Sequence, residues 1–246
     1  LEPDFVVVAW DKSKTATSQR KEIYPDYKAG RTRPPDDFFA QIPLLHELLE
    51  AFGWPVLELD HYEADDIIGT ISLEATKKDI ETCIVSGDYD MMQLLSDHTS
   101  VYINKKGSDM MRFTEVEFEE KYGVKLAQFI DYKALVGDSS DNIPGVRGIG
   151  PKAAQTLLAT YQTLEVIYEH IGELKGAQKT ILEENKDNAF MSRELAQILC
   201  DSPIELMWKE AEINHPDLAA VAKKLKDCEF HSLTKRLPTH RQRETT

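Results

Sequence analysis

The sequence predicts an α/β fold in which a mostly parallel central sheet precedes a helical C-terminal lobe. Short apolar, β-branched runs alternate with segments of helical periodicity over about the first 113 residues, a pattern typical of a parallel sheet with crossover helices. Beyond about residue 114 the strand signal fades and helical periodicity continues. With 246 residues, 41% of them hydrophobic, the chain is large enough to fold without disulfides or a structural metal.

The predicted core occupies residues 1–125. The continuous apolar run at 5–10 is typical of a strand buried on both faces. A helix is expected at 36–52, where apolar residues recur at helical spacing until Gly53. Further strands are expected at 56–59, 81–85 and 101–104, and further helices at 63–76, 90–95 and 115–122.

The predicted lobe occupies residues 126–246 and is helical. A stretch rich in Gly and Pro at 137–150 separates the first two of its expected helices. These helices are expected at 126–135, 151–161, 164–171, 177–184, 188–199 and 216–225.

The charge balance is strongly acidic, with 29 Lys and Arg against 43 Asp and Glu and a formal net charge of −14. This average argues against nucleic acid, because affinity for phosphates comes from Lys and Arg. Acidic residues gathered around metal ions would lower the average in the same way, since the ions offset them locally. The positions of the charged residues are therefore more informative about a nucleic-acid partner than the net charge.

Other features of the chain exclude several classes of protein. Three widely separated cysteines fit neither a disulfide framework nor a zinc motif, so we expect a cytosolic protein. The longest apolar run is far shorter than the ~20 residues of a membrane helix. The chain begins at Leu1 without a signal segment, so we expect a piece or a processed form of a longer protein.

Acidic clusters follow three of the predicted strands, and a fourth lies in the stretch rich in Gly and Pro. Loops at the carboxyl ends of parallel strands converge on one crevice, so we expect these clusters to meet. Each has an ordinary alternative, because Asp commonly caps helices and acidic residues are favoured in a first helical turn. The clusters are Asp11; Glu63, Asp65 and Asp66; Asp88 and Asp90; and Asp138 and Asp141.

The chemistry of these clusters indicates a particular kind of ion. Carboxylate oxygens without His or Cys suit Mg²⁺ or Mn²⁺ rather than zinc. Two such ions are a known device for displacement at a phosphodiester, because they activate water and stabilise the developing charge. The clusters therefore predict a two-metal site.

The stretch 145–154 is the second signal. Two of its glycines allow tight backbone with positive φ, and the proline that follows suits the first position of a helix. Exposed N–H groups at the start of that helix can hold a phosphate oxygen. The pattern predicts a helix-hairpin-helix element that grips a nucleic-acid backbone, with a simple tight turn as the alternative. The residues expected to touch DNA here are Gly145, Arg147, Gly148, Gly150 and Lys152.

The loop 12–33 is the third signal, with a solvated surface loop as its alternative. Lys28 and Arg31 are the best candidates to hold a scissile phosphate and to stabilise its charge during catalysis. Tyr24 and Tyr27 are interleaved with the basic residues and could stack on unpaired bases. Its basic residues are Lys12, Lys14, Arg20, Lys21, Lys28, Arg31 and Arg33, of which we expect Arg20, Lys28 and Arg31 to contact DNA together with Tyr27.

Together these motifs resemble those of a known family. In chain order they are AWDK at 9–12, YKAGR at 27–31, YEADD at 62–66, SGDYD at 86–90 and GDSSDNIPGVRGIGPK at 137–152. They are similar to the 5′-nuclease domains of the bacterial DNA polymerase I and flap endonuclease family. The resemblance covers nearly the whole chain.

The resemblance implies a PIN-like nuclease core with a basic arch at about 12–35, and a helix–three-turn–helix element in the lobe. It implies a structure-specific 5′-3′ exonuclease and 5′-flap endonuclease of DNA replication and repair, using two Mg²⁺ or Mn²⁺ ions, with K⁺ at the hairpin. Expected substrates are DNA with a 5′ flap or a junction of single and double strand, and RNA-primed DNA. A monomer associated with the bacterial nucleoid in the cytoplasm is expected, with no membrane partner.

The resemblance also assigns roles to individual residues. Lys28 and Arg31 match basic residues of the arch that clasps the 5′ strand. Asp11, Glu63 and Asp65 match the first metal site. The second metal cluster is matched by Asp66, Asp88, Asp90, Asp138 and Asp141.

Two departures from the family pattern leave alternatives open. The family begins with a strand that carries another metal-binding Asp, and this sequence has no such strand before Asp11. Tyr89 and Gln19 stand where relatives usually have Lys and Phe. One alternative is a catalytically incomplete, structure-selective DNA-binding module. Another is a two-metal phosphatase acting on small phosphate esters, against which the hairpin and the basic loop argue.

Overall fold

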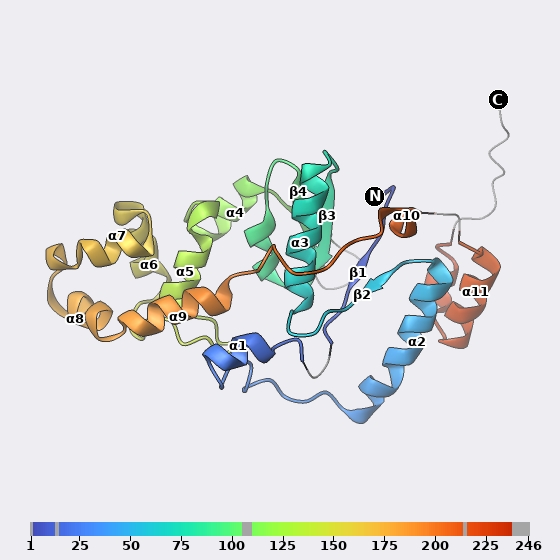
Figure 1. Cartoon of the computed structure of the whole chain (residues 1–246), viewed down its shortest axis with the longest axis horizontal. Helices are drawn as coiled ribbons and strands as arrows, with labels where there is room; N and C mark the ends of the chain where they lie inside the picture. The colour runs from blue at the N-terminus through green and yellow to red at the C-terminus, as the bar shows by residue number, and fades with distance from the viewer. Residues whose placement is uncertain (1, 13–14, 105–109, 214–215, 238–246) are drawn as a thin grey trace. The chain divides into compact units, whose positions relative to one another are not determined.

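The computed structural model describes residues 2–12, 15–104, 110–213 and 216–237, and Figure 1 labels the elements along the chain. The chain divides into two compact units. The smaller unit comprises Leu1–Trp10, Thr32–Glu58 and Glu205–Thr246, and the larger unit comprises Asp11–Arg31 and Leu59–Ile204. The domain boundary near residue 125 that the sequence indicates stays a prediction.

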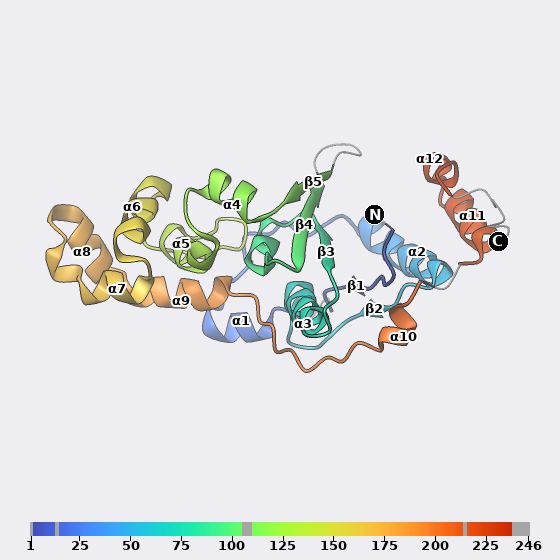
Figure 2. The same cartoon turned by 90° about the horizontal axis from the view of Figure 1, so that it is seen from above.

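A three-stranded sheet lies in the larger unit. Its order is β3 (Thr82–Ser86), β4 (Thr99–Asn104) and β5 (Met110–Phe113), with β3 and β4 parallel and β5 antiparallel to β4. The register places Ile84 opposite Val101 and Val101 opposite Phe113, and all three side chains are buried. Helix α3 (Ala64–Lys77) lies along one side of this sheet, as Figure 2 shows.

The remaining elements of the larger unit are helical and share one apolar core with the sheet. Phe118, Leu135, Leu158 and Ile167 are among the fully buried side chains of that core. The helices are α1 (Ser18–Ile23), η1 (Tyr89–Leu94), α4 (Glu115–Tyr122), η2 (Leu126–Gln128), α5 (Phe129–Val136), α6 (Pro151–Tyr161), α7 (Leu164–Glu169), η3 (Ile171–Glu173), α8 (Gly176–Glu184) and α9 (Lys186–Ala196).

The smaller unit contains a two-stranded parallel sheet and a pair of helices. Strand β1 (Val8–Ala9) pairs with β2 (Val56–Leu57). Helix α2 (Asp36–Phe52) packs against α11 (Leu218–Asp227) through Leu48, Val221 and Leu225, and the two helices lie side by side in Figure 1. The unit also contains α10 (Trp208–Ala211) and α12 (His231–Thr234).

Local signals explain why several predicted helices are confirmed. Helix α2 ends where Gly53 adopts the left-handed conformation, α4 begins at a capping box formed by Thr114 and Glu117, and α6 begins with Pro151. Among the described residues, no helix is both long enough and apolar enough to span a membrane.

The sheet differs from the prediction. The described strands form two separate sheets rather than one, and β5 is an antiparallel strand that the sequence analysis missed. Four residues with one charge among them give too short a pattern to identify a strand. Strand β1 spans two residues, and the run at 5–10 is only half-buried instead of covered on both faces.

The loop from Gly137 to Gly150 is closed on itself by backbone contacts. Asp138 and Ile143 exchange two backbone hydrogen bonds of 2.9 and 2.8 Å, and the Val146 amide donates to the Leu135 carbonyl. Gly137 and Gly145 both have positive φ, and a Cβ on Gly145 would lie 2.4 Å from the Gly137 nitrogen. Only glycine at these two positions allows the backbone segments to approach so closely.

Candidate active site

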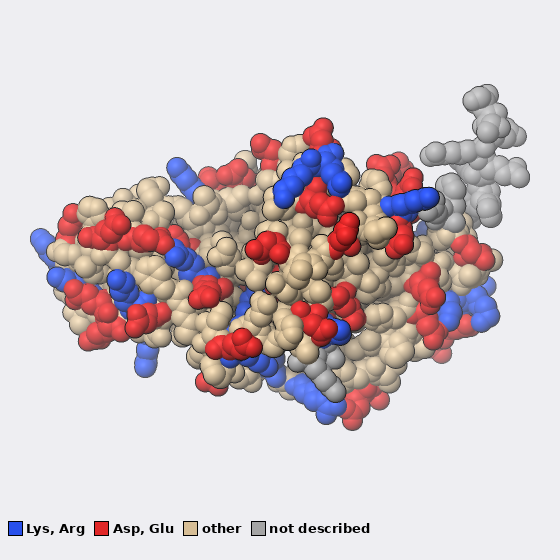
Figure 3. All heavy atoms as spheres, in the orientation of Figure 1, with Lys and Arg blue, Asp and Glu red and all other residues tan. Residues whose placement is uncertain are grey.

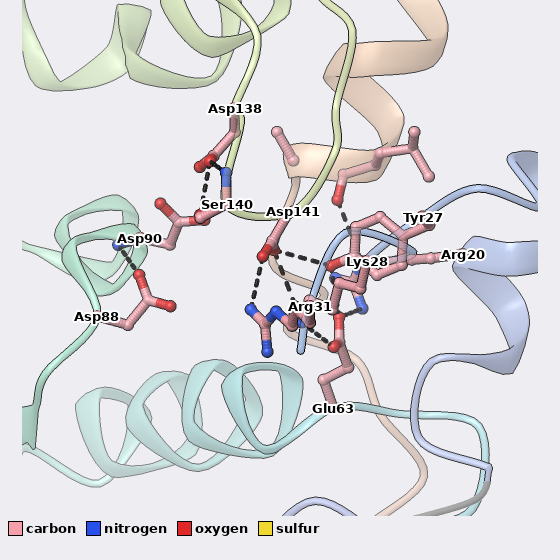
Figure 4. A network of polar contacts seen from close by, with 12 residues as sticks. Arg20, Tyr27, Lys28, Arg31, Glu63, Asp88, Asp90, Asp138, Ser140 and Asp141 are labelled. Carbon is pink, nitrogen blue, oxygen red and sulfur yellow. Dashed lines mark hydrogen bonds and ion pairs between the residues drawn. The ribbon is translucent and has the colours of Figure 1, made fainter. Parts of the chain in front are cut away.

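The predicted acidic residues all lie in the larger unit, and three of them line an open cleft of about 550 Å³. Asp88 and Asp90 come from the start of η1, and Asp138 comes from the loop after α5; all three line the cleft. In Figure 4, Asp90 lies beside Asp138 and Ser140, while Glu63 and Asp141 lie together with Tyr27, Lys28 and Arg31. Clusters that are distant in sequence are thus brought into one region.

Asp66 has a structural role in this region. Its side chain is fully buried and forms two hydrogen bonds of 2.8 Å with the Arg20 guanidinium. It also accepts from the backbone amides of Glu63 and Leu199. Arg20 is itself buried and donates to the carbonyls of Leu195 and Gln197. We therefore leave Asp66 and Arg20 out of the ion and DNA contacts proposed below.

Tyr27 is likewise an internal residue. Its side chain is 2% exposed, and its hydroxyl can donate to Glu63 Oε2 at 2.9 Å or to Asp141 Oδ2 at 3.2 Å. Burial and the charge of Glu63 raise the pKa of Tyr27, so it remains a donor at neutral pH. A ring in this position cannot stack on a base, so we also leave Tyr27 out of the DNA contacts.

The two expected catalytic cations lie on the expected metal ligands. Lys28 forms an ion pair with Glu63, and its Nζ lies 3.6 Å from Asp141 Oδ2. Arg31 donates to Asp141 Oδ1 at 2.6 Å, and about half of its side chain remains exposed. Arg31 therefore combines a carboxylate partner with access to a phosphate from solvent.

Lys133 forms the centre of a third group of charges. Its buried ammonium pairs with Asp90 and, at 2.8 Å, with Asp138. Asp138 also accepts from the amide and hydroxyl of Ser140, and although burial opposes the effect, the Lys133 and Ser140 bonds lower its pKa to about 2. Burial raises the pKa of Asp90 and exceeds the opposing effect of Lys133.

Asp65 lies in a different electrostatic environment. Burial, followed by the charges of Asp88 and Glu63, raises the pKa of Asp65 to about 7, and the charge of Asp11 adds to the rise. Within the described residues, no hydrogen bond or ion pair reaches the Asp65 side chain. Asp11 accepts a hydrogen bond of 2.6 Å from the Ala64 amide at the start of α3. The charge of Lys28 opposes the rise, so the carboxylates around Asp65 are only partly balanced within the protein.

These residues fit an oxygen-liganded divalent ion in donor type, because they are carboxylates that repel one another. In the part of the chain that the structure describes, however, no group of three or more Asp, Glu, His or Cys converges closely enough to form a complete ion site. Several of the carboxylate oxygens are instead paired with Lys28, Arg31 and Lys133.

The predicted hairpin before α6 exposes its cations. Val146 and Ile149 are buried and anchor the turn, while Arg147 and Lys152 are exposed. Gly148 has a φ of 102°, as expected, whereas Gly150 has a φ of −94° and so does not require glycine. Neither Arg147 nor Lys152 forms an ion pair with any described residue, which leaves both side chains able to meet a phosphate.

The basic loop is less uniform than its sequence suggests. Lys12 pairs with Asp60 at 2.5 Å and Arg33 pairs with Asp36 at 2.8 Å, whereas Lys14 lies outside the described residues. On the face drawn in Figure 3, acidic and basic side chains are mixed and no continuous basic surface is visible.

Sequence reasoning missed Lys133 and the aromatic wall of the cleft. Lys133 stands alone as a cation in the apolar helix α5, directly before the acidic loop, and such an isolated charge is the available signal for a buried ion pair. The aromatic residues that line the cleft are Tyr89, Tyr122, Phe129 and Tyr132.

Comparison with known families and proteins gives consistent matches. Residues 1–123 match the 5′-3′ exonuclease N-terminal resolvase-like domain, and residues 124–219 match the 5′-3′ exonuclease C-terminal SAM fold. DNA polymerase I of Bacillus subtilis is 43% identical over 237 residues, which cover 96% of this chain and 27% of that protein. DNA polymerase I of Caldicellulosiruptor bescii is 41% identical over 240 residues, covering 96% and 28%. The chain thus spans about a quarter of the length of these relatives.

Solved structures share the fold at lower identity. The T5 D15 protein co-crystallised with metal ions has a TM-score of 0.67 and 23% identity, covering 91% of this chain and 84% of that one. The catalytic core of Rad2 in complex with DNA substrate has a TM-score of 0.58 and 16% identity, covering 89% and 73%. These matches confirm an α/β core with a helical C-terminal domain.

Proposed function

The chain belongs to the 5′-3′ exonuclease family, and on that premise we propose that it hydrolyses phosphodiester bonds in DNA that carries a 5′ flap or a junction of single and double strand. The observation that carries the proposal is the group of carboxylates around Asp65, where burial and then the charges of Asp88 and Glu63 raise the pKa of Asp65 to about 7 although the charge of Lys28 opposes the rise. A divalent cation would balance the negative charge of these carboxylates.

The residues that would hold the ions divide into two sets. The first set is Asp65 with Asp11, Glu63 and Asp88, and the second set is Asp90, Asp138 and Asp141. Mg²⁺ or Mn²⁺ bound there would activate water and stabilise charge on the phosphate oxygens.

The chain's own side chains would position the substrate. Arg31, half-exposed beside Asp141, would exchange its carboxylate partner for a phosphate oxygen of the substrate. Lys28 would remain on Glu63 and hold that carboxylate in place. Arg147 and Lys152 would bind the duplex backbone at the hairpin, where K⁺ would add to the same contact. RNA-primed DNA is proposed as a further substrate, and the protein as a monomer of the nucleoid region.

A labelled 5′-flap duplex incubated with Mg²⁺ tests this function. Cleavage that stops in excess EDTA and falls at least about 100-fold in Asp88→Asn is expected, since loss of even a supporting contact at a metal site costs 10–100-fold. The matched control is Asp187→Asn, a carboxylate of α9 that does not line the cleft. Undiminished cleavage by Asp88→Asn would contradict the proposal.

The pairing of several carboxylates with Lys28, Arg31 and Lys133 favours one alternative, a DNA-binding module that does not cut. Under this alternative, the chain would bind the flap duplex with an affinity that falls steeply with salt, and no divalent ion would produce cleavage.

A further inference from the structure

The cleft has an aromatic wall that the proposed hydrolysis does not use. Tyr89, Tyr122, Phe129 and Tyr132 line the same cleft as Asp88, Asp90 and Asp138. A cleft of about 550 Å³ falls within the size range of small-molecule sites. The lining of this cleft thus combines carboxylates, which suit cations, with rings, which suit a flat apolar group.

Tyr122 is held rigidly in this wall. Its ring stacks on Phe118 at 4.9 Å, lies 4.8 Å from Phe129 and meets Tyr132 edge-on at 6.0 Å, all between ring centroids. Burial, followed by the charge of Asp90, raises the pKa of Tyr122 to about 12, so its hydroxyl is protonated at neutral pH. The side chain is therefore a fixed ring with a proton to donate.

Tyr132 has a ring face that is not covered by another ring. Its one aromatic contact within the described residues is the edge-on contact with Tyr122, and its ring is half-buried. Within the same residues, the hydroxyls of Tyr122 and Tyr132 have no hydrogen-bond partner. Tyr89, in contrast, is already covered by the Lys121 ammonium, which lies 3.3 Å from the ring centroid.

An aromatic ligand fits this wall better than a cationic one. The Lys121 ammonium already occupies the face of Tyr89, and the Lys133 ammonium already pairs with both Asp90 and Asp138. A flat ring could stack on Tyr132 where this residue lines the cleft, and could accept a hydrogen bond from the hydroxyl of Tyr122 or Tyr132. Nucleobases have both features, and stacking on tyrosine accepts any base because every base has a π-face.

We propose that Tyr132, supported by Tyr122, stacks the base of a nucleotide that adjoins the scissile phosphate. The carboxylates and the two tyrosines share one cleft, so a nucleotide whose phosphate lies at Asp88 and Asp138 has its base beside the aromatic wall. The inference rests on the proposed function, because it requires a nucleic-acid strand in the cleft. The subsite binds any of the four bases.

The experiment compares a flap duplex with versions that lack the base on one side or the other of the scissile bond. Removing one of these two bases is expected to weaken wild-type binding, measured by fluorescence anisotropy, by about tenfold, the size of one base–aromatic contact. Tyr132→Leu is expected to bind the intact duplex about tenfold more weakly than the wild type does. On that abasic duplex, the variant and the wild type are expected to bind with the same affinity. Tyr132→Phe, which keeps the ring, retains the discrimination.

Two controls separate the subsite from the fold and from the proposed function. Tyr102→Leu removes a tyrosine of β4 that does not line the cleft and is expected to bind both duplexes like the wild type. Losses in Tyr132→Leu that simply add to those of base removal overturn the proposal, while cleavage by the wild type still supports the proposed function.

A second measurement tests the subsite without any cleavage. With Mg²⁺ present, a deoxynucleoside 5′-monophosphate is expected to bind the wild type about tenfold more tightly than 2-deoxyribose 5-phosphate, and Tyr132→Leu is expected to abolish the difference. Equal binding of the two ligands by the wild type contradicts the proposal.

Discussion

The two acidic groups of the candidate site contain the same residue type but differ in how their charge is compensated. Around Asp138 and Asp90, the protein supplies its own counter-ion in Lys133, and the pKa of Asp138 falls to about 2. Around Asp65, neighbouring carboxylates add to the effect of burial, and the pKa rises to about 7. The two groups therefore differ in how much of their negative charge the protein's own lysines compensate.

The largest effect is expected from removing the internal counter-ion. Lys133→Met leaves the half-buried carboxylates of Asp90 and Asp138 without their counter-ion, so the ion-free protein should lose up to about 3–5 kcal/mol of unfolding free energy. Urea denaturation in EDTA measures this loss, and excess Mg²⁺ should restore part of it. Lys175→Met, at an exposed position before α8, is the matched control. If the two variants are equally stable in EDTA, Lys133 does not act as a counter-ion.

The opposite change in unfolding free energy is expected from substituting Asp65. Asp65→Asn removes a charge that is unfavourable in the folded state, so the ion-free protein should gain up to about 4 kcal/mol at pH 8, the cost of a pKa of about 7 against an ordinary value near 4. The same variant should lose affinity for Mn²⁺ in calorimetry. A loss of stability in EDTA would show that Asp65 is already balanced by a contact within the protein.

The pH dependence of stability follows from the same two pKa values. Asp65 binds a proton more tightly when folded, so its contribution is complete below about pH 4 and is lost as the pH rises to about 7. The stability advantage of Asp65→Asn over the wild type should grow across that range in EDTA. Asp138 has a lowered pKa, so its contribution should instead disappear as the pH falls from about 4 to about 2. A constant difference between variant and wild type from pH 4 to 8 would contradict this assignment.

The smallest effect on stability is expected from substituting Arg31, which pairs with Asp141. Its side chain is about half exposed, so Arg31→Gln should cost no more than about 1 kcal/mol of stability. Its effect on DNA should be clearer, because losing one phosphate contact reduces the slope of log affinity against log salt by about one. Lys21→Gln, on the exposed surface of α1, is the control. An unchanged slope in Arg31→Gln would mean that Arg31 stays with Asp141 when DNA binds.

The sequence predicts the positions of helices better than the arrangement of strands. The boundaries of α2, α4 and α6 depend on Gly53, Thr114 and Pro151, each of which acts within its own helix. The partition of the strands into two sheets depends on pairings between distant segments, such as Val8 with Val56, for which short apolar runs carry no information.

The candidate site shows the same limit. The acidic residues could be predicted because most of them follow strands, but their partners could not. Arg20 meets Asp66 across 46 positions of sequence, and Lys133 meets Asp90 across 43. Burial of Arg20 and Tyr27 likewise depends on tertiary contacts, so the composition of the basic loop suggests more DNA contacts than the exposed surface supports.

The close approach of Gly137 to Gly145 holds together two arms of the backbone that have different proposed functions. One arm carries Asp138 and Asp141, and the other continues directly into the turn that exposes Arg147 and Lys152. A duplex bound by the second arm would therefore place its backbone at a fixed distance from the carboxylates of the first arm. The protein would then cut at a fixed number of nucleotides from the junction. A bulkier residue at either glycine would make the position of the cut less uniform.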